Sequence, residues 1–440
     1  ARALPLNRWM ALPTVQTVTD TVSAIQAGLI WAEGLGLHAS LGDRVVFSMR
    51  SGTPLAGEVV ALQAERVAIL PEGPMDGLSI GMRVELIFAP SLAPANSWIG
   101  RIIDPFGQPL DGRPLLAGGE ERGFRPAPPP AASRNRLGAR LDTGLAVFDT
   151  LLPLVRGQRM GLFAGSGVGK STLLSALARG VSADVVVIGL IGERGRELRE
   201  FVEEVLGPEG MARSVVVAAT SDQSPLARRR CAWAAMTVAE HFRDQGKHVL
   251  FLADSITRFA EAHREIALAA GESPSYRGFP PSTSQMIMSL AERSGPGPVG
   301  SGDITAIFSV LVAGSDMEEP VADILRGVLD GHVVLDRAIA ERGRFPAVDV
   351  LRSVSRSLPQ AASTRENALI ARARSLLGTY AESELMIRAG LYGPGSDARL
   401  DEAVRIFPQL DTFFTRKSPD AKQSFSQLSE ALGPVSARPG

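Results

Sequence analysis

Cysteine is nearly absent from this 440-residue sequence, since Cys231 is its single example. One cysteine excludes an internal disulfide framework and favours a reducing compartment. We expect Cys231 to be a small buried apolar residue of a helix. An excess of charge is also lacking: 46 basic and 47 acidic residues leave a net charge of −1, which gives no overall attraction to nucleic acid or to an anionic membrane.

Long apolar runs are lacking as well. No run of about 18 apolar residues, the length of a membrane-spanning helix, is present. No basic segment followed by an apolar one opens the chain, so we expect no signal peptide. Together these absences predict a cytoplasmic protein.

Apolar residues make up 45% of the chain, which allows a sizeable core, and the length predicts two or three domains. Short apolar runs at 44–47, 57–62 and 66–70 are separated by turn sequences. Short strands at this spacing predict a small β-barrel or sandwich in the first part of the chain. Residues 104–135 are rich in proline and glycine, and we expect an extended connection there.

From about residue 137 onward, apolar strand-like runs alternate with segments of helical period. We expect the strands at 159–164, 184–192, 214–219, 248–253 and 304–313. After the second of these, apolar residues with helical spacing predict one continuous helical face: Leu198, Phe201, Val202, Val205 and Leu206. This alternation is typical of an α/β fold with a mostly parallel sheet.

The strand-like runs stop after about residue 360. Segments 361–389 and 400–432 are expected to be helices, separated by a Tyr-Gly-Pro-Gly sequence that begins at Tyr392. The chain is therefore interpreted as three domains. They are an N-terminal β-barrel domain at 1–95, an α/β domain at 96–360 and a C-terminal helical domain at 361–440.

A phosphate-binding loop follows the strand expected at 159–164. Its glycines let successive backbone N–H groups point at phosphate oxygens, and the helix that follows adds its positive end. The lysine would contact the β- and γ-phosphates, and the hydroxyl of Ser171 would be a ligand of Mg²⁺. We expect the loop to bind nucleotide through Gly165, Ser166, Gly167, Val168, Gly169, Lys170, Ser171 and Thr172.

Two further acidic residues follow buried strands. Asp254 ends the strand expected at 248–253, where a carboxylate can hold Mg²⁺ or cap a helix, and the phosphate loop favours the metal. Glu193 ends the strand expected at 184–192, where it could activate the attacking water or simply favour a helix N-terminus. Arg194 could contact a phosphate or pair with an acid, and the pattern leaves these alternatives open.

Several further segments complete a set of motifs, and the set resembles the flagellar and type III secretion ATPase family, which is similar to the catalytic subunits of rotary ATP synthases. The matches run in family order from about residue 98 to 415. The segments are 165–171, 191–197, 254–260, 264–269, 278–282, 329–335, 345–350 and 353–356. Segments 284–289 and 317–320 depart from the common secretion-ATPase forms.

The resemblance implies a RecA-like P-loop NTPase core with an N-terminal β-barrel and a C-terminal helical domain. It implies that Glu193 is the catalytic carboxylate and that Arg194 contacts the γ-phosphate. It also implies that Arg356 is an arginine finger that reaches the nucleotide of a neighbouring subunit. Without the resemblance, Arg352 would be as good a candidate for the finger. Phe345 stands where the family places an adenine-stacking aromatic, and a buried core phenylalanine is the alternative.

By the same resemblance, we expect Mg²⁺-dependent hydrolysis of ATP by a homohexameric motor that drives flagellar protein export. The expected partners are regulatory or stator-like and stalk-like export proteins, the membrane export gate, and export substrates with their chaperones. The expected location is the cytoplasmic face of the bacterial inner membrane. The closest alternative is the ATPase of a virulence injectisome.

Other classes of protein fit the sequence less well. The Asp-Gly-His segment at Asp330 and the lack of an acidic motif in the C-terminal helices disfavour a rotary ATP synthase subunit, and Glu193 disfavours a non-catalytic subunit. The first 95 residues have few basic residues, which disfavours a nucleic-acid translocase. We expect the arginine run at 228–230 to be a solvated or subunit-facing surface, and no nucleic-acid partner.

Overall fold

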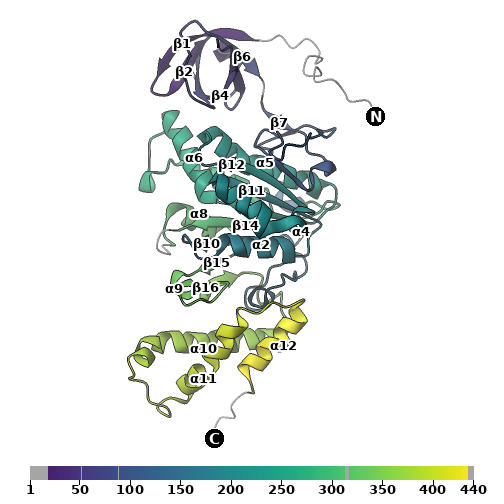
Figure 1. Cartoon of the computed structure of the whole chain (residues 1–440), viewed down its shortest axis with the longest axis vertical. Helices are drawn as coiled ribbons and strands as arrows, with labels where there is room; N and C mark the ends of the chain where they lie inside the picture. Colours follow the sequence, from purple (N-terminus) through teal and green to yellow (C-terminus); the bar gives the residue numbers. More distant parts are fainter. Residues whose placement is uncertain (1–17, 51, 88, 313–316, 435–440) are drawn as a thin grey trace. The chain divides into compact units, whose positions relative to one another are not determined.

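A computed structural model describes residues 18–50, 52–87, 89–312 and 317–434 (Figure 1). Contacts between residues divide the chain into two compact units. One is built on the chain up to Ser91 and includes Ser224–Leu226 and Arg264–Ser273, and the other contains the rest. The predicted domain boundaries at 95 and 360 stay predictions. The first 17 residues of the predicted N-terminal domain and Ala313 lie outside the described residues.

The first unit is a closed antiparallel barrel with the strand order β1-β2-β5-β4-β3-β6. Inward and outward side chains alternate as the pleat requires: in β3, Val45 and Phe47 are buried, while Arg44 and Val46 are not. The predicted barrel is confirmed. Its strands are β1 (Thr19–Gln26), β2 (Leu29–Glu33), β3 (Arg44–Phe47), β4 (Leu55–Leu62), β5 (Arg66–Pro71) and β6 (Arg83–Ile87).

The second unit is built on a sheet of order β16-β15-β10-β14-β13-β11-β12-β8. Neighbouring strands are parallel except that β16 runs antiparallel to β15. The strands are β8 (Arg101–Ile103), β10 (Arg159–Ala164), β11 (Val185–Glu193), β12 (Ser214–Thr220), β13 (Val249–Asp254), β14 (Ile304–Leu311), β15 (Gly331–Leu335) and β16 (Val348–Ser355). A small separate pair is β7 (Ser91–Leu92) with β9 (Arg122–Gly123).

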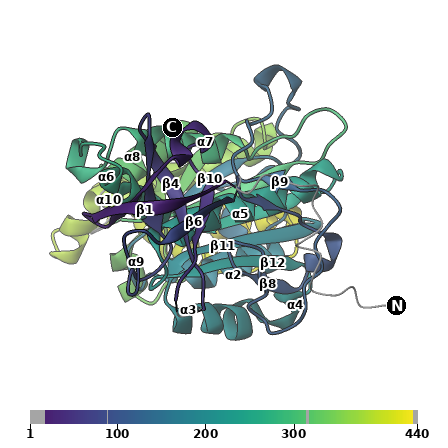
Figure 2. The same cartoon turned by 90° about the horizontal axis from the view of Figure 1, so that it is seen from above.

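Helices cover both faces of this sheet (Figure 2). The helices of the central part are α1 (Ala146–Asp149), α2 (Lys170–Gly180), α3 (Gly195–Glu200), α4 (Gly207–Met211), α5 (Pro225–Asp244), α6 (Ile256–Ala269), α7 (Ser282–Glu292), α8 (Pro320–Val328) and α9 (Arg337–Glu341). Along β11, Val186 and Ile188 share a core with α2, whereas Val185 and Val187 share one with α5 to α8. A strand buried on both faces explains the unbroken apolar run in the sequence.

The C-terminal helices are α10 (Thr364–Arg388), α11 (Ala398–Phe413) and α12 (Ala421–Leu432). A capping box formed by Ser363 and Glu366 starts α10. The single helix expected at 400–432 is wrong, because the chain leaves the helix after Phe413 and Asp420 caps a new one. Pro419 disfavours helical geometry at Ser418, which explains the break. No helix of the described residues is both long and apolar enough to cross a membrane.

One expectation for the central part differs from the structure, and another is confirmed. The helix after β11 is not continuous, because Phe201–Leu206 is π-helical between α3 and α4. The wider π-helical turn shifts the side-chain register, yet the predicted apolar face still packs on the core. The prediction for Cys231 is confirmed: it is buried, its Sγ lies 3.4 Å from the carbonyl oxygens of Leu190 and Val217, and burial raises the pKa of its thiol.

The arginine run is not a solvated surface. Arg229 and Arg230 are buried within the chain, and only Arg228 is partly exposed. The guanidinium of Arg230 lies 4.7 Å from the ring centre of Phe106, and that of Arg229 lies 5.0 Å from the ring centre of Trp233. Aromatic faces stabilise these charges through cation–π contacts. The expected surface was wrong because the covering aromatics come partly from distant segments.

A buried ion pair joins α5 to the residue after α7. Arg293 donates to both carboxylate oxygens of Glu240 at 3.0 and 2.7 Å, and it also bonds the Phe124 carbonyl and the Thr237 hydroxyl. Only 2% of the Arg293 side chain and 5% of the Glu240 side chain are exposed. Through its bond to the Phe124 carbonyl, Arg293 therefore also fixes the proline-rich connection against the sheet domain.

We expect Arg293→Met to lower the free energy of unfolding by about 3 kcal/mol, because it leaves the Glu240 carboxylate buried and poorly compensated. Urea denaturation followed by circular dichroism measures this. The control is Arg337→Met, which breaks an exposed pair with Glu341 and should cost less than about 1 kcal/mol. Equal effects of the two substitutions would contradict the prediction.

Candidate functional site

The carboxyl ends of β10, β11 and β13 carry the predicted site residues to one edge of the sheet. The phosphate loop runs from the end of β10 into α2, which begins at Lys170. Gly167 and Gly169 have φ angles of +76° and +84°, a region that residues with a side chain rarely adopt. Val168 is buried and anchors the loop between them. The backbone is therefore shaped as a phosphate cradle at a helix N-terminus.

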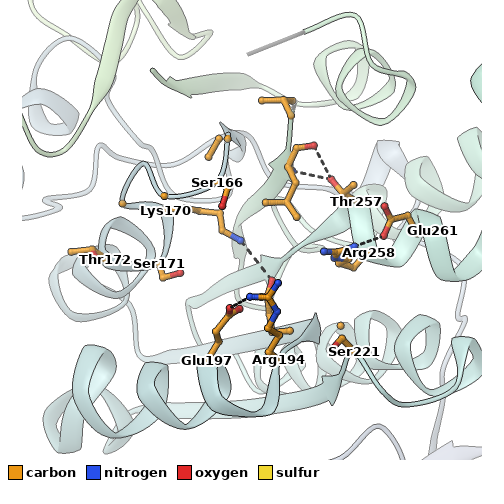
Figure 3. A pocket seen from close by; sticks show the side chains of 18 residues that line it. Ser166, Lys170, Ser171, Thr172, Arg194, Glu197, Ser221, Thr257, Arg258 and Glu261 are labelled. Atoms are coloured by element: carbon orange, nitrogen blue, oxygen red, sulfur yellow. Dashed lines mark hydrogen bonds and ion pairs between the residues drawn. The ribbon is translucent and has the colours of Figure 1, made fainter. Parts of the chain in front are cut away.

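A cavity of about 730 Å³ opens over this loop (Figure 3). The lining contains all the predicted phosphate-loop residues except Val168, together with Glu193 and Arg194. It is completed by residues that the sequence analysis did not name as site residues: Ala164, Gly192, Glu197, Ser221, Thr257, Arg258, Glu261, Leu311 and Val312.

Lys170 is the centre of the charge network in this cavity. Its Nζ forms an ion pair with Oδ1 of Asp254 and lies 3.7 Å from Oε1 of Glu193. The hydroxyl of Ser309 donates to the same Asp254 oxygen at 2.6 Å. The structure thus brings Lys170, Glu193 and Asp254 together, as predicted from three separate motifs.

The Glu193 carboxyl group titrates far above its ordinary range. Burial raises its pKa to about 7, and the negative charge of Asp254 adds to the increase. The ammonium group of Lys170 acts in the opposite direction, because it favours the ionised carboxylate. A carboxyl group that titrates near neutral pH suits a general base.

Two ion pairs belong to the lining of the cavity. Arg194 donates to Glu197 at 3.1 Å, and Arg258 donates to Glu261 at 2.8 Å (Figure 3). Thr257 accepts from the backbone N–H of Leu311 at 2.9 Å and so joins α6 to the end of β14. The signal that could have identified Arg258 is its position four residues after Asp254, one helical turn into α6.

Asp254, Phe345 and Arg356 are absent from the lining of this cavity, and Asp254 lines a smaller cavity together with Ser171 and Glu193. Phe345 is 49% exposed, which excludes the alternative of a core phenylalanine. Its ring lies beside the phosphate loop, since a Cβ atom on Gly169 would be 3.2 Å from Cδ1 of Phe345. Arg356 is exposed, and its Nη2 donates to the Arg326 carbonyl at 3.2 Å. Within one chain, Arg356 is therefore not part of the site.

The residues present fit a magnesium nucleotide. Ser171 offers a hydroxyl at the first turn of α2, and Asp254 offers a carboxylate, both of which are oxygen ligands that Mg²⁺ prefers. Two protein ligands are typical of Mg²⁺, which takes its other ligands from water and from substrate phosphates. The fold and the site define a P-loop nucleotide-hydrolysing ATPase of the RecA-like class.

Comparison with known proteins agrees with this class. The nucleotide-binding domain of the ATP synthase alpha/beta family matches residues 144–355, and the C-terminal domain of the type III secretion ATPase EscN matches residues 362–433. The flagellum-specific ATP synthase of Caulobacter vibrioides is 44% identical over 426 residues, which cover 94% of this chain and 96% of that relative. The chain belongs to the family of flagellar and type III secretion ATPases.

Solved structures show the same likeness. The assembled ATPase EscN of the enteropathogenic E. coli type III secretion system is 35% identical with a TM-score of 0.86, covering 94% of this chain and 100% of that chain. EscN in complex with its central stalk EscO has a TM-score of 0.84 at 34% identity, with the same coverage. The predicted ATPase fold and the predicted hydrolysis of ATP are thereby confirmed.

We expect Glu193→Gln to keep ATP binding but to lower turnover by about 10²–10⁴-fold, because the amide cannot accept a proton from water. Phosphate release measures turnover, and a fluorescent ATP analogue measures binding. The matched control is Glu204→Gln, which makes the same change at an exposed side chain of the π-helical segment Phe201–Leu206 and should keep the parent rate. A variant at Glu193 that hydrolyses ATP at the parent rate would exclude this residue as the base.

The same substitution should change how stability depends on pH. The folded-state pKa of Glu193 is raised from 4.5 to about 7, so its contribution to stability is present below pH 4.5 and lost as pH rises through 7. Without nucleotide, Glu193→Gln should therefore melt at a higher temperature than the parent at pH 8, and this difference should shrink toward pH 5. Scanning calorimetry at both values tests it, and a difference independent of pH would contradict it.

Proposed function

We propose that this chain is the subunit of a homohexameric motor that hydrolyses ATP with Mg²⁺ to energise flagellar type III protein export. The observation that carries the proposal is the position of the Glu193 carboxylate, 3.7 Å from the phosphate-loop Lys170 in the cavity. The flagellar direction is supported by the 44% identity to the Caulobacter vibrioides relative, against 35% to EscN.

Each residue of the site has a role in this proposal. The phosphate loop and Lys170 bind the β- and γ-phosphates, and Glu193 orients the attacking water and accepts its proton. Ser171 and Asp254 would hold Mg²⁺, which neutralises charge that develops on the phosphate oxygens. Arg194 would contact the γ-phosphate after leaving Glu197, and the Phe345 ring would stack on the adenine.

Arg356 is the part of the site that a second subunit would supply. Its side chain is exposed and lies outside the cavity lining of its own chain. In a closed ring, each subunit presents the same surface to its neighbour, so Arg356 could reach the next nucleotide. The alternative finger, Arg352, lies 3.8 Å from Asp336 of its own chain. The neighbour would therefore complete the site.

The partners follow from the same proposal. The complex of EscN with its central stalk EscO supports a stalk-like partner for this chain. Regulatory or stator-like proteins, the membrane export gate, and export substrates with their chaperones complete the set. We place the motor in the cytoplasm, at the inner face of the bacterial inner membrane.

The second candidate is the motor of a virulence injectisome, which is favoured by the likeness to EscN over 94% of the chain. Both candidates share the chemistry of the site. Expression in a strain that lacks its flagellum-specific ATP synthase separates them, because only a flagellar motor restores filament export. Restored secretion by an injectisome strain instead would favour the second candidate.

We expect two inactive variants to restore each other when they are mixed. Arg356→Ala keeps Glu193, and Glu193→Gln keeps Arg356, so about a quarter of the interfaces in a randomly mixed ring hold one intact copy of each group. Phosphate release from the mixture should approach that fraction of the parent rate and fall on dilution. Arg352→Ala, which keeps the finger, is the control and should stay active alone.

An inactive mixture of two folded, assembling variants would contradict catalysis in trans. A parent rate per chain that is independent of protein concentration, under conditions where the chain is monomeric, would also contradict it.

A further inference from the structure

A second cavity of about 270 Å³ lies within the unit that contains the sheet, and no residue of the phosphate loop is in its lining. Its walls come from α9 and β16 on one side and from α10 and α11 on the other, elements that lie next to one another in Figure 1. The volume is close to that of small-ligand pockets, which begin at about 300 Å³. None of the predicted site residues lines this cavity.

An aromatic wall forms one side of this cavity. The rings of Tyr380 and Phe407 are stacked, with centroids 3.7 Å apart and planes at 5° to each other. Phe414 is also part of the lining, and the guanidinium of Arg344 lies 5.3 Å from its ring centre. Flat aromatic surfaces of this kind favour a planar conjugated ligand.

Arg344 supplies a donor that bonds no atom in the described part of the chain. Its side chain is only 9% exposed, with Nε 3.0 Å from Oδ1 of Asp411 and Nη2 donating to the Val348 carbonyl at 2.9 Å. The remaining nitrogen, Nη1, is buried and has no hydrogen-bond partner among the residues that the structure describes. Leaving a buried donor of a charged group unpaired is unfavourable, so an acceptor at this place would be stabilising.

The carboxylates of the lining do not form a cation-binding site, because each of them already has a hydrogen-bond or ion-pair partner. Asp411 pairs with Arg344, and Glu384 pairs with Arg342 at 3.2 Å. Asp336 accepts from the first turn of α9, and Asp349 accepts from two backbone N–H groups of β16. The unfilled hydrogen-bonding capacity is therefore that of a donor.

We propose that this cavity is a second ligand site, separate from the nucleotide site, for a planar conjugated molecule with a carbonyl or carboxylate group. The ring of the ligand lies against Tyr380 and Phe407, and its oxygen accepts from Arg344. The proposal goes beyond ATP hydrolysis, and it holds whether or not the chain drives export.

The chain connects this cavity directly to the nucleotide site. Arg344 lines the cavity, and the next residue, Phe345, lies against Gly169 of the phosphate loop. A ligand that holds Arg344 therefore restrains the backbone that places the Phe345 ring. By linkage, such a ligand and a nucleotide change each other's affinity by the same factor.

Coumarin-3-carboxylate is a suitable probe, because it is planar, fluorescent and carries a carbonyl and a carboxylate. Its binding to the full chain is measured by fluorescence anisotropy with saturating Mg-ADP, which keeps the probe out of the nucleotide site. We expect one probe per chain. Arg344→Met and Tyr380→Leu should each weaken binding by about tenfold or more, the loss of one charge-assisted hydrogen bond or of one stacking surface.

Matched controls make the same changes elsewhere. Tyr392→Leu removes a tyrosine that bonds Asp401 outside the cavity, and Arg337→Met removes an exposed arginine of α9. Both should bind the probe like the parent. Absence of saturable binding to the parent, or unchanged binding to the Tyr380→Leu variant, would overturn the proposal. If the Arg344→Met variant does not fold, probe binding to the Tyr380→Leu variant alone tests the proposal.

Discussion

The contact between the Lys170 ammonium group and the Asp254 carboxylate is the interaction on which the rest of the nucleotide site depends. Lys170 begins α2, after the phosphate loop that follows β10, and Asp254 ends β13. The two groups meet because the strands of a parallel sheet end at the same edge. Both are largely buried, so each would be costly to keep without the other. In the proposed function, a Mg-nucleotide that enters the cavity would replace this internal neutralisation with phosphate and metal charges. The pair thus places both signs of charge where a ligand that carries both would bind.

Sequence patterns predicted the fold well where the burial of an element shows in the pattern of its own residues. Each strand of the central sheet that carries a catalytic group appears as an apolar run, because both of its faces are covered. Elements that depend on distant segments were not predictable in the same way. β8 is only three residues long and becomes a strand by pairing with β12. Arg230 lies against the rings of Phe106 and Phe124 from distant parts of the chain, which its own helix cannot predict.

The residues of the site also differ in how far the local sequence identifies them. The phosphate loop has a local backbone requirement, so glycines, Lys170 and Ser171 identify it from the sequence alone. Glu193 remained ambiguous there, because an acid at a helix start has a simple electrostatic reason. Its burial and its proximity to Lys170 and Asp254 give it the properties of a base. Arg258 and Glu261 escaped attention because a charged pair on an amphipathic helix looks like ordinary surface. Arg356 could be proposed only from the family resemblance.

The exposed position of Arg356 has a mechanistic consequence for the proposed motor. One chain already contains the groups that would bind phosphate, metal and water, whereas the group that would stabilise the transition-state charge lies outside the lining of its own cavity. Binding and hydrolysis then depend on different conditions: one chain suffices to bind ATP, but only an assembled neighbour makes turnover fast. An unassembled subunit would thus bind ATP and hydrolyse it only slowly. Hydrolysis would begin where the ring is formed, which links the use of ATP to the place where the ring assembles.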